Sequence, residues 1–493
     1  MEHFPSKYLL ILILTFAAIL RLPGIVWGLP TFDQYANPIY YHPDEKKIIW
    51  GAQGFPEEIF TRTDLRYPTA LHYFLGTVML PFRSAKAEMP LLAYNDIYFL
   101  AGRLISLLQS LAACGLTYVL GKKLFNWQTG LVAAAFLAVT LYHVRGSMLA
   151  TTDVATSFWL LVSLLLALRL ERARGWLDFV ALGASVGILV GVKYSGVFVA
   201  VGIGVLFIRY FLNARLPNER YRLIGGIALS VAVSLVVFGL TTPSAVLHPQ
   251  ALFSSVQYEN YRVGEKLLPT WNMPVWQNFI TVSMGAMGLP LVLLGLVGLV
   301  LSPRYAPKVL LPYSSLVIVY YLYFRSALLE RYLITIMPVI CILAAYWLVM
   351  MIASSRKAVV YAGWGLLIFT LSYGMYQDIV LAKLLVRDTR SQAAAYIIEE
   401  IPAGSTIALG DPTEPWRYPM IGSDHKLVTL DENPDYVVLS SFHGWINSDV
   451  KDHFLESGDE LVKYKVAAEF QPAWKLNVEF VSPFLKIYQR NGK

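Results

Sequence analysis

The chain has 493 residues, of which 56% are hydrophobic and only 15% are charged, whereas soluble globular proteins carry about 25% charged residues. So few charges cannot cover a water-exposed surface, and the mean hydropathy of +0.53 indicates that most of the chain lies in lipid. A wholly soluble protein is therefore excluded. The net charge of +7 could suggest nucleic-acid binding, but its basic excess lies in the apolar part of the chain, so no nucleic-acid partner is expected.

The charged residues are unevenly distributed. Residues 378–493 hold 12 basic and 17 acidic residues, 25% of that segment, which is an ordinary soluble composition. Residues 1–377 hold 28 basic and 16 acidic residues, 12% of the segment, with a net charge of +12. We therefore predict a transmembrane domain over 1–377 and a soluble domain over 378–493. The latter alternates a helix-like segment at 389–400 with short strand-like segments, which predicts a small α/β fold.

Eleven apolar runs predict an α-helical polytopic membrane protein. They lie near residues 8–20, 97–120, 130–142, 154–170, 177–192, 195–208, 223–240, 279–301, 309–324, 332–352 and 359–376. The first run resembles a signal peptide, but no small-residue cleavage site follows, so we expect it to be retained. A further run at 68–82 contains His72 and is expected to lie along the membrane surface.

The basic residues between these runs predict the orientation of the chain in a cell membrane. If the run at 68–82 does not cross, the connections rich in Lys and Arg fall on one side, which the positive-inside rule places in the cytoplasm. The N-terminus is then cytoplasmic and the C-terminal domain extracytoplasmic. The outer face holds the loops 22–96, 143–153, 241–278 and 325–331.

Two places on this outer face carry acidic residues that are candidates for catalysis. Asp44 and Glu45 follow Pro43 in the first loop, where they could simply begin a helix, since Pro and acidic residues favour a first turn. Asp153 follows Thr151 and Thr152 directly before a span, where it could cap a helix. For both places a structural role stays open beside a catalytic one.

Basic residues on the same face are harder to explain as structural. Arg66, Lys193, Arg262 and Arg331 all fall at outer membrane boundaries. A charge at membrane depth costs about 2.5–3.5 kcal/mol on insertion scales, so each needs a partner or contact with water. Reaching water is an equally good explanation for Arg331. Lys193 has no acidic residue nearby in the sequence, which favours an anionic ligand.

Short motifs, each weak by itself, occur in order along the whole chain. They are His42-Pro43-Asp44-Glu45, Arg66-Tyr67-Pro68, Leu71-His72-Tyr73, Gly121-Lys122-Lys123-Leu124-Phe125, Ala150-Thr151-Thr152-Asp153, Lys193-Tyr194, Arg331-Tyr332, Asp388-Thr389-Arg390 and Pro434-Asp435-Tyr436-Val437-Val438. Their order and topology together resemble a known family, the GT-C membrane glycosyltransferases, and within it the protein O-mannosyltransferases and the lipid A aminoarabinose transferases.

The resemblance implies transfer of a monosaccharide from a polyprenyl-phosphate lipid to an acceptor at the outer face. It implies that Asp44 is the general base, with Glu45 holding substrate and Asp153 as the acid of the second loop. Arg66, Lys193 and Arg331 correspond to cations that bind the lipid phosphate. The full predicted substrate-binding set is Arg66, Tyr67, His143, Lys193, Tyr194, Arg262 and Arg331.

The chain departs from the aminoarabinose branch at Thr69-Ala70, where that branch has a second proline, and its tail has only about 115 residues. The acceptor therefore stays open between a protein hydroxyl, as in O-mannosylation, and a lipid-linked glycan or lipid A-like molecule. Asp44, Glu45, Asp153 and His143 could also bind a hard divalent metal ion, although their spacing is not diagnostic.

The chemistry agrees with the types of residue on this face. A glycosidase needs two carboxyl groups because its leaving alcohol must be protonated. A lipid phosphate leaves as a stable anion, so one base and several cations suffice, and attack opposite the phosphate predicts inversion. A polytopic transporter is the main alternative from another class, but transporters tend to show repeated halves with charges near the midplane, and neither pattern is evident. A membrane-anchored sensor would leave the outer acids unexplained.

Overall fold

The structure, a computed structural model, describes residues 6–29, 40–87, 91–171, 175–261, 275–305, 307–324, 329–441, 463–474, 476, 478 and 481–492. The chain forms two compact units. The helical unit consists of Met1–Arg21, Trp50–Val78 and Arg103–Asp378. The sheet unit consists of Leu22–Ile49, Met79–Gly102 and Ile379–Lys493. The sheet unit thus includes two early segments that a boundary drawn from charge content does not predict.

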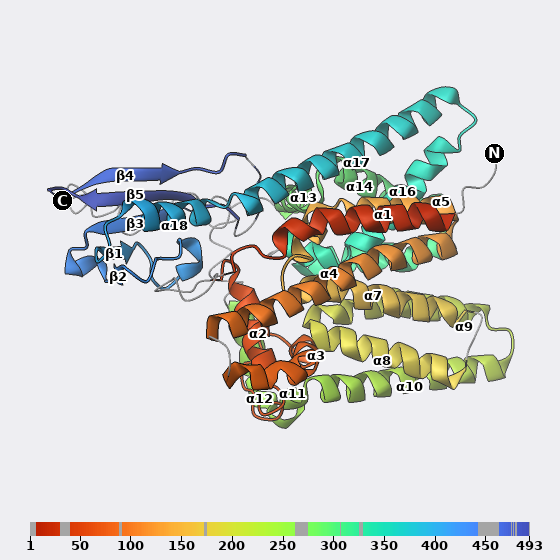
Figure 1. Ribbon diagram of the computed structural model, residues 1–493. Coiled ribbons are helices and arrows are strands. Elements are labelled where there is room, and N and C mark those ends of the chain that lie inside the picture. Colours follow the sequence, from red (N-terminus) through yellow and green to blue (C-terminus); the bar gives the residue numbers. More distant parts are fainter. Residues whose placement is uncertain are drawn as a thin grey trace. The chain divides into compact units, whose positions relative to one another are not determined.

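The apolar runs of the sequence fall on helices (Figure 1). The helices before residue 200 are α1 Ser6–Arg21, α2 Pro43–Gln53, α3 Ala70–Met79, α4 Leu91–Leu124, α5 Trp127–Ala138, α6 Leu141–Gly146, α7 Thr152–Arg169 and α8 Trp176–Val192. The later ones are α9 Val199–Asn213, α10 Pro217–Thr241, α11 Pro243–Leu247, α12 Pro249–Tyr261, α13 Val275–Met287, α14 Leu289–Tyr305, α15 Pro307–Phe324, α16 Met337–Ile352 and α17 Lys357–Val386.

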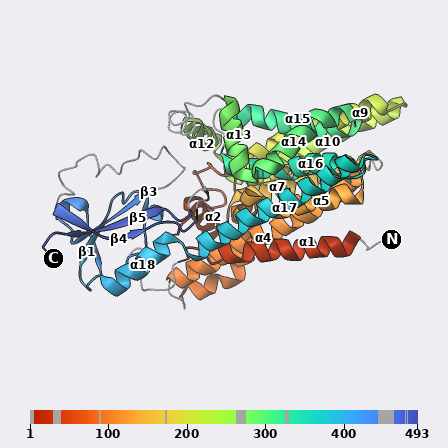
Figure 2. The same ribbon diagram turned by 90° about the horizontal axis from the view of Figure 1, so that it is seen from above.

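Glycines allow some of these helices to pack closely. α8 and α10 run alongside each other (Figure 1), and Figure 2 shows the helices from a second direction. A Cβ atom on Gly183 would collide with the carbonyl oxygen of Ser230, and one on Gly187 with that of Ser234. Small residues four positions apart are a common way for helices to approach each other in membranes, where dispersion contacts replace the hydrophobic effect between helices.

Six described helices are long and apolar enough to cross a membrane, and a bent pair would make seven. Four shorter apolar helices, α5, α8, α15 and α16, account for the remaining predicted runs. The predicted fold class is confirmed, while the number of eleven spans stays a prediction. α3 has ten residues, or about 15 Å at 1.5 Å per residue, which is too short for a hydrocarbon core of about 30 Å.

One predicted span has a different form in the structure. The run at 279–301 consists of α13 and α14, which meet at an angle of 117°. Gly288 stands between them with φ +79°, a conformation that residues with a side chain rarely adopt. Hydropathy alone does not register such a local backbone turn, so the sequence did not indicate this bend, and a single span over this run stays a prediction.

The sheet unit contains the predicted small α/β domain. Its helix α18, Thr389–Glu400, is followed by strands β1 Thr406–Leu409, β2 Lys426–Leu427, β3 Tyr436–Ser441, β4 Tyr464–Phe470 and β5 Phe484–Arg490. The strand order is β2-β1-β3-β5-β4, parallel between β1 and both its neighbours and antiparallel elsewhere. Ile397 of α18 shares a buried core with Ile407, Val438 and Ile487 of the strands.

Candidate active site

Asp44 and Glu45 lie in the first turn of α2, which begins at Pro43. Asp44 accepts a hydrogen bond of 3.2 Å from the Lys47 ammonium, and its side chain is 14% exposed. Glu45 is fully buried. A helix start explains why acids stand here, but it does not require a buried carboxylate, since burying a charge is costly unless it is paired.

Asp153 and Lys193 form an ion pair in the helical unit. The Lys193 Nζ atom donates to Asp153 Oδ1 at 2.5 Å, and the Thr151 hydroxyl donates to Oδ2 at 3.4 Å. The two side chains are 15% and 12% exposed. The pair joins the first turn of α7 to the end of α8. Lys193 therefore has an acidic partner that its sequence neighbours did not indicate, and its binding of an anionic ligand stays a prediction.

The ring of Tyr332 brings a second cation to this pair. Lys193 Nζ lies 5.1 Å from the centroid of the ring, and the Arg331 guanidinium lies 5.8 Å from it, both within cation–π range. Arg331 is 6% exposed and belongs to the 3-10 helix η6, Glu330–Thr335. The Tyr320 hydroxyl donates to the Tyr332 carbonyl at 2.8 Å. Three predicted residues, Asp153, Lys193 and Arg331, thus gather around Tyr332.

Arg66 is held by an acid that the sequence analysis did not single out. Asp64 accepts bonds of 2.8 and 2.6 Å from Arg66 Nε and Nη2. These hydrogen bonds lower the pKa of Asp64 to about 2. The guanidinium also lies 5.5 Å from the centroid of the Tyr258 ring. The spacing of Asp64, two residues before Arg66, is the sequence signal that could have revealed this pair.

The segment that carries Arg66 is tied to the residue after Lys193. The Tyr194 hydroxyl donates to the Leu65 carbonyl oxygen at 2.9 Å. Tyr67 is half-buried. Tyr67 and Tyr194, both predicted to bind substrate, therefore lie on the two segments that this bond connects. Arg262, also predicted to bind substrate, lies outside the described residues.

His143 lies in a different, fully buried cluster. Arg21 Nη2 donates to its Nδ1 atom at 3.3 Å, Ser110 lies 3.4 Å from the same atom, and Ser157 lies 3.5 Å from Nε2. Its ring is 0% exposed. The structure thus surrounds His143 with protein groups from α1, α4 and α7 and does not bring it to Tyr332. Its predicted role in substrate binding stays a prediction.

A metal ion was left open by the sequence. Within the described ranges, no three residues of the types His, Cys, Asp and Glu come together in a way that could hold one. Of the four candidates, Asp44 and Glu45 belong to the sheet unit, and His143 and Asp153 belong to the helical unit.

Comparison with known proteins supports the predicted class. Residues 95–239 match the family model of dolichyl-phosphate-mannose-protein mannosyltransferases. Since that match covers less than a third of the chain, it is a likeness over one segment. No curated protein matches the sequence closely enough to count as a relative.

Solved structures share the fold over nearly the whole chain. The oligosaccharyltransferase of Archaeoglobus fulgidus, in complex with zinc and sulfate, matches with a TM-score of 0.55 and 14% identity, covering 95% of this chain and 72% of its own. ArnT from Cupriavidus metallidurans matches without ligand with a TM-score of 0.52 and 14% identity, covering 97% of both chains. Its complex with undecaprenyl phosphate matches with a TM-score of 0.53, at the same identity and coverage.

At these identities the likeness to solved structures concerns the fold. The predicted resemblance to GT-C glycosyltransferases is confirmed by the family match and the shared fold together. The matched family and these solved proteins are glycosyltransferases of membranes, which is the enzyme class that the sequence predicts.

Proposed function

We propose that the protein is an inverting glycosyltransferase that moves a monosaccharide from a polyprenyl-phosphate donor to an acceptor hydroxyl at the outer membrane face. The observation that carries this proposal is the cluster of Asp153, Lys193 and Arg331 around Tyr332. Its members come from α7, the end of α8 and η6, so the fold assembles two cations from distant parts of the chain in one place. Such cations suit the leaving phosphate.

In the proposed reaction Asp44 removes the proton from the acceptor hydroxyl as its oxygen attacks the anomeric carbon. The bond from that carbon to the phosphate oxygen breaks, and the lipid phosphate leaves as an anion. Preorganised donors such as Lys193 and Arg331 stabilise the developing negative charge. Because the attack comes from the side opposite the phosphate, the configuration is inverted.

The ion pair with Asp153 determines how many N–H groups of Lys193 can bind a phosphate. An ammonium group has three N–H donors, and one of them goes to Asp153 Oδ1. The other two can bind phosphate oxygens without breaking the pair. We therefore assign Asp153 the task of orienting Lys193, with no role as a second base.

For the acceptor we propose a protein hydroxyl, supported by the description of the matched family. A lipid-linked glycan or lipid A-like acceptor is the alternative, supported by the fold shared with ArnT bound to undecaprenyl phosphate over 97% of this chain. The donor lipid is proposed from the same two findings. We also propose that the N-terminus is cytoplasmic and that residues 378–493 form an extracytoplasmic domain, as the distribution of Lys and Arg predicts.

The test uses the purified full chain in lipid nanodiscs. Undecaprenyl phosphates carrying mannose, glucose or aminoarabinose are offered with a Ser/Thr-rich peptide or with lipid A, and mass spectrometry follows the transfer. Transfer to either acceptor supports the proposal and identifies the acceptor. No consumption of any of the three donors would contradict the proposed donor class.

Substitution of the acids then tests the base. A positioned base contributes about 10² to 10⁴ in rate, so Asp44→Asn should bind undecaprenyl phosphate yet transfer almost no sugar. Glu45→Gln should be milder, and Asp424→Asn, at an exposed acid of the sheet unit, should match wild type. Full transfer by Asp44→Asn with loss in Glu45→Gln would make Glu45 the base, and full transfer by both would remove this mechanism.

A further inference from the structure

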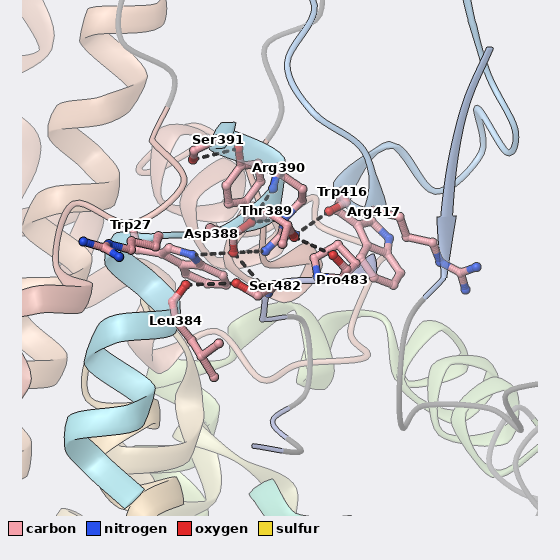
Figure 3. Close-up of polar contacts among 12 residues, drawn as sticks. Trp27, Leu384, Asp388, Thr389, Arg390, Ser391, Trp416, Arg417, Ser482 and Pro483 are labelled. Atoms are coloured by element: carbon pink, nitrogen blue, oxygen red, sulfur yellow. Dashed lines mark hydrogen bonds and ion pairs between the residues drawn. The ribbon is translucent and has the colours of Figure 1, made fainter. Parts of the chain in front are cut away.

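The residues directly before the proposed base are held by a buried polar cluster in the sheet unit. Tyr41 stands three positions before Asp44, precedes α2, and is 2% exposed. Its contacts come from two distant segments, near Trp27 and near Arg390. This cluster is drawn in Figure 3.

Asp388 is the hub of the cluster. Its Oδ1 atom accepts bonds from the backbone N–H and Nε of Arg390, both at 2.9 Å. Its Oδ2 atom accepts from Arg390 Nη2 at 2.8 Å, and from Trp27 Nε1 and the backbone N–H of Ser482 at 3.1 Å each (Figure 3). A carboxylate offers about four lone-pair sites, so these five bonds leave Asp388 no capacity for a substrate.

Arg390, held by Asp388, in turn contacts the Tyr41 ring. Its guanidinium lies 3.8 Å from the centroid of the Tyr41 ring and 5.4 Å from that of Trp27, and Nη1 donates to the Trp416 carbonyl at 2.7 Å. Asp388 and Arg390 are both 0% exposed. A planar guanidinium fixed at its edge presents its face to a ring in one orientation, which an ammonium cannot do.

Other contacts restrict Tyr41 further. Its ring lies edge-on to Trp27 at 5.8 Å between centroids, and its hydroxyl lies 3.4 Å from Ser391 Oγ. Gly28, with φ +61°, packs so closely that a Cβ atom there would overlap the Tyr41 ring. Tyr41 therefore has little freedom to move while Arg390 is in place.

We propose that Asp388 and Arg390 position the proposed base: they fix Tyr41 and thereby the first turn of α2 that carries Asp44. Arg390 is thus a positioning residue. This role rests on the proposed function, because it gives Asp44 a task that depends on precise placement. A misplacement of about 1 Å can cost about 10²-fold in rate, so the soluble part of the chain contributes to the catalytic rate without contacting substrate.

The first test measures placement without substrate. Hydrogen exchange of the peptide covering residues 40–53 is compared in wild type, Arg390→Met and the control Arg490→Met, which removes a cation from a second ion pair of the same unit, with Asp435. We expect faster exchange of the first turn of α2 in Arg390→Met alone. Unchanged exchange there would overturn the proposal, whatever the activity of the protein.

The second test measures coupling in the transfer assay. Arg390→Met should lower kcat by about 10 to 100-fold with donor KM changed less than about threefold. Tyr41→Leu should act similarly, and the double variant should be no worse than either single one, because both remove the same restraint. Arg390→Lys should recover little, and Tyr41→Phe, which keeps the ring, should recover most of kcat.

The outcomes separate this inference from the proposed function. Additive losses, or a fall in donor affinity that parallels the loss of thermal stability, would mean that Arg390 only stabilises the fold. If instead wild type shows no transfer while Arg390→Met still loosens α2, the proposed reaction fails and the positioning of α2 stands.

Discussion

At the scale of single residues, two Asp-x-Arg segments share one local geometry. In Asp64-Leu65-Arg66 and in Asp388-Thr389-Arg390, one carboxylate oxygen accepts from the arginine backbone N–H and Nε, and the other accepts from Nη2. The pairs differ in burial, because the Arg66 and Asp64 side chains are 31% and 45% exposed, whereas the second pair is fully buried. Exposed pairs rearrange at little cost and buried ones do not. Arg66 can therefore turn towards a ligand, while Arg390 is fixed.

The Asp64 pair leads to a prediction on pH. The pKa of Asp64 is lowered to about 2 by Arg66, so the pair favours the ordered state above the ordinary Asp pKa of about 4, and this contribution disappears as the pH falls towards 2. Asp64 then does not titrate where enzymes usually work. We expect the acid limb of kcat/KM between pH 4 and 8 to be the same in wild type and Asp64→Asn. A shifted limb in the variant would contradict the lowered pKa.

The Asp153–Lys193 pair leads to a prediction on stability. Removing one partner of a buried ion pair destabilises a protein by about 3–5 kcal/mol, because a charge is left unpaired. The Asp153 and Lys193 side chains are 12% and 15% exposed, so we expect a cost near the lower end of this range. Asp153→Asn should therefore lower Tm more than the double variant with Lys193→Met, with a coupling free energy of at least about 1 kcal/mol. Thermal unfolding in detergent measures this, and an additive double variant would show that the two groups do not interact.

At the scale of elements, the bend between α13 and α14 depends on Gly288. Its φ of +79° disfavours any side chain, and a Cβ atom would lie 2.8 Å from a ring carbon of Tyr373 and 2.9 Å from the Gln377 side-chain oxygen. Gly288→Ala should therefore destabilise the protein by about 1–2 kcal/mol or more. Gly365→Ala on α17, where a Cβ meets no atom within 4 Å, should be neutral or slightly stabilising. A lower Tm for Gly365→Ala than for Gly288→Ala would refute this.

The helices could be predicted because hydropathy is read from consecutive residues. Contacts between residues far apart in the sequence could not be predicted. Apolar runs identify the helices because hydropathy is a property of consecutive residues. The break at Gly288 had a local signal, since Pro290 follows two residues later, but a hydropathy window averages over it. The Asp153–Lys193 pair joins residues 40 positions apart and requires the start of α7 to meet the end of α8, which only the packing of the two helices determines.

At the scale of the whole molecule, the sequence did not predict which segments of the chain form the sheet unit. Charge content predicts a polar domain from residue 378, whereas the sheet unit also includes Leu22–Ile49 and Met79–Gly102. Trp27 contacts Asp388 and Tyr41 contacts Arg390. No local sequence pattern indicates a partner more than 300 residues away. The contacts between the residues just before the proposed base and those proposed to position it are therefore seen only in the structure.

The orientation of the chain in the membrane is the last prediction. α4 ends with Lys122 and Lys123, and α10 begins beside Arg220 and Arg222, so the positive-inside rule places both ends in the cytoplasm. α3 is too short to cross, at about 15 Å for ten residues. With α3 left out, the eleven predicted spans, an odd number, separate the N-terminus from residues 378–493.

Reporter fusions after Lys123, Arg222 and Lys493 test this orientation. We expect cytoplasmic signals at the first two sites and an extracytoplasmic signal at Lys493. A fusion after Met1 is the matched control, because it should report the cytoplasm whichever helices cross later. A cytoplasmic signal at Lys493 together with the expected signals elsewhere would place an even number of spans before it. Residues 378–493 would then lie in the cytoplasm, which would rule out the proposed extracytoplasmic C-terminal domain.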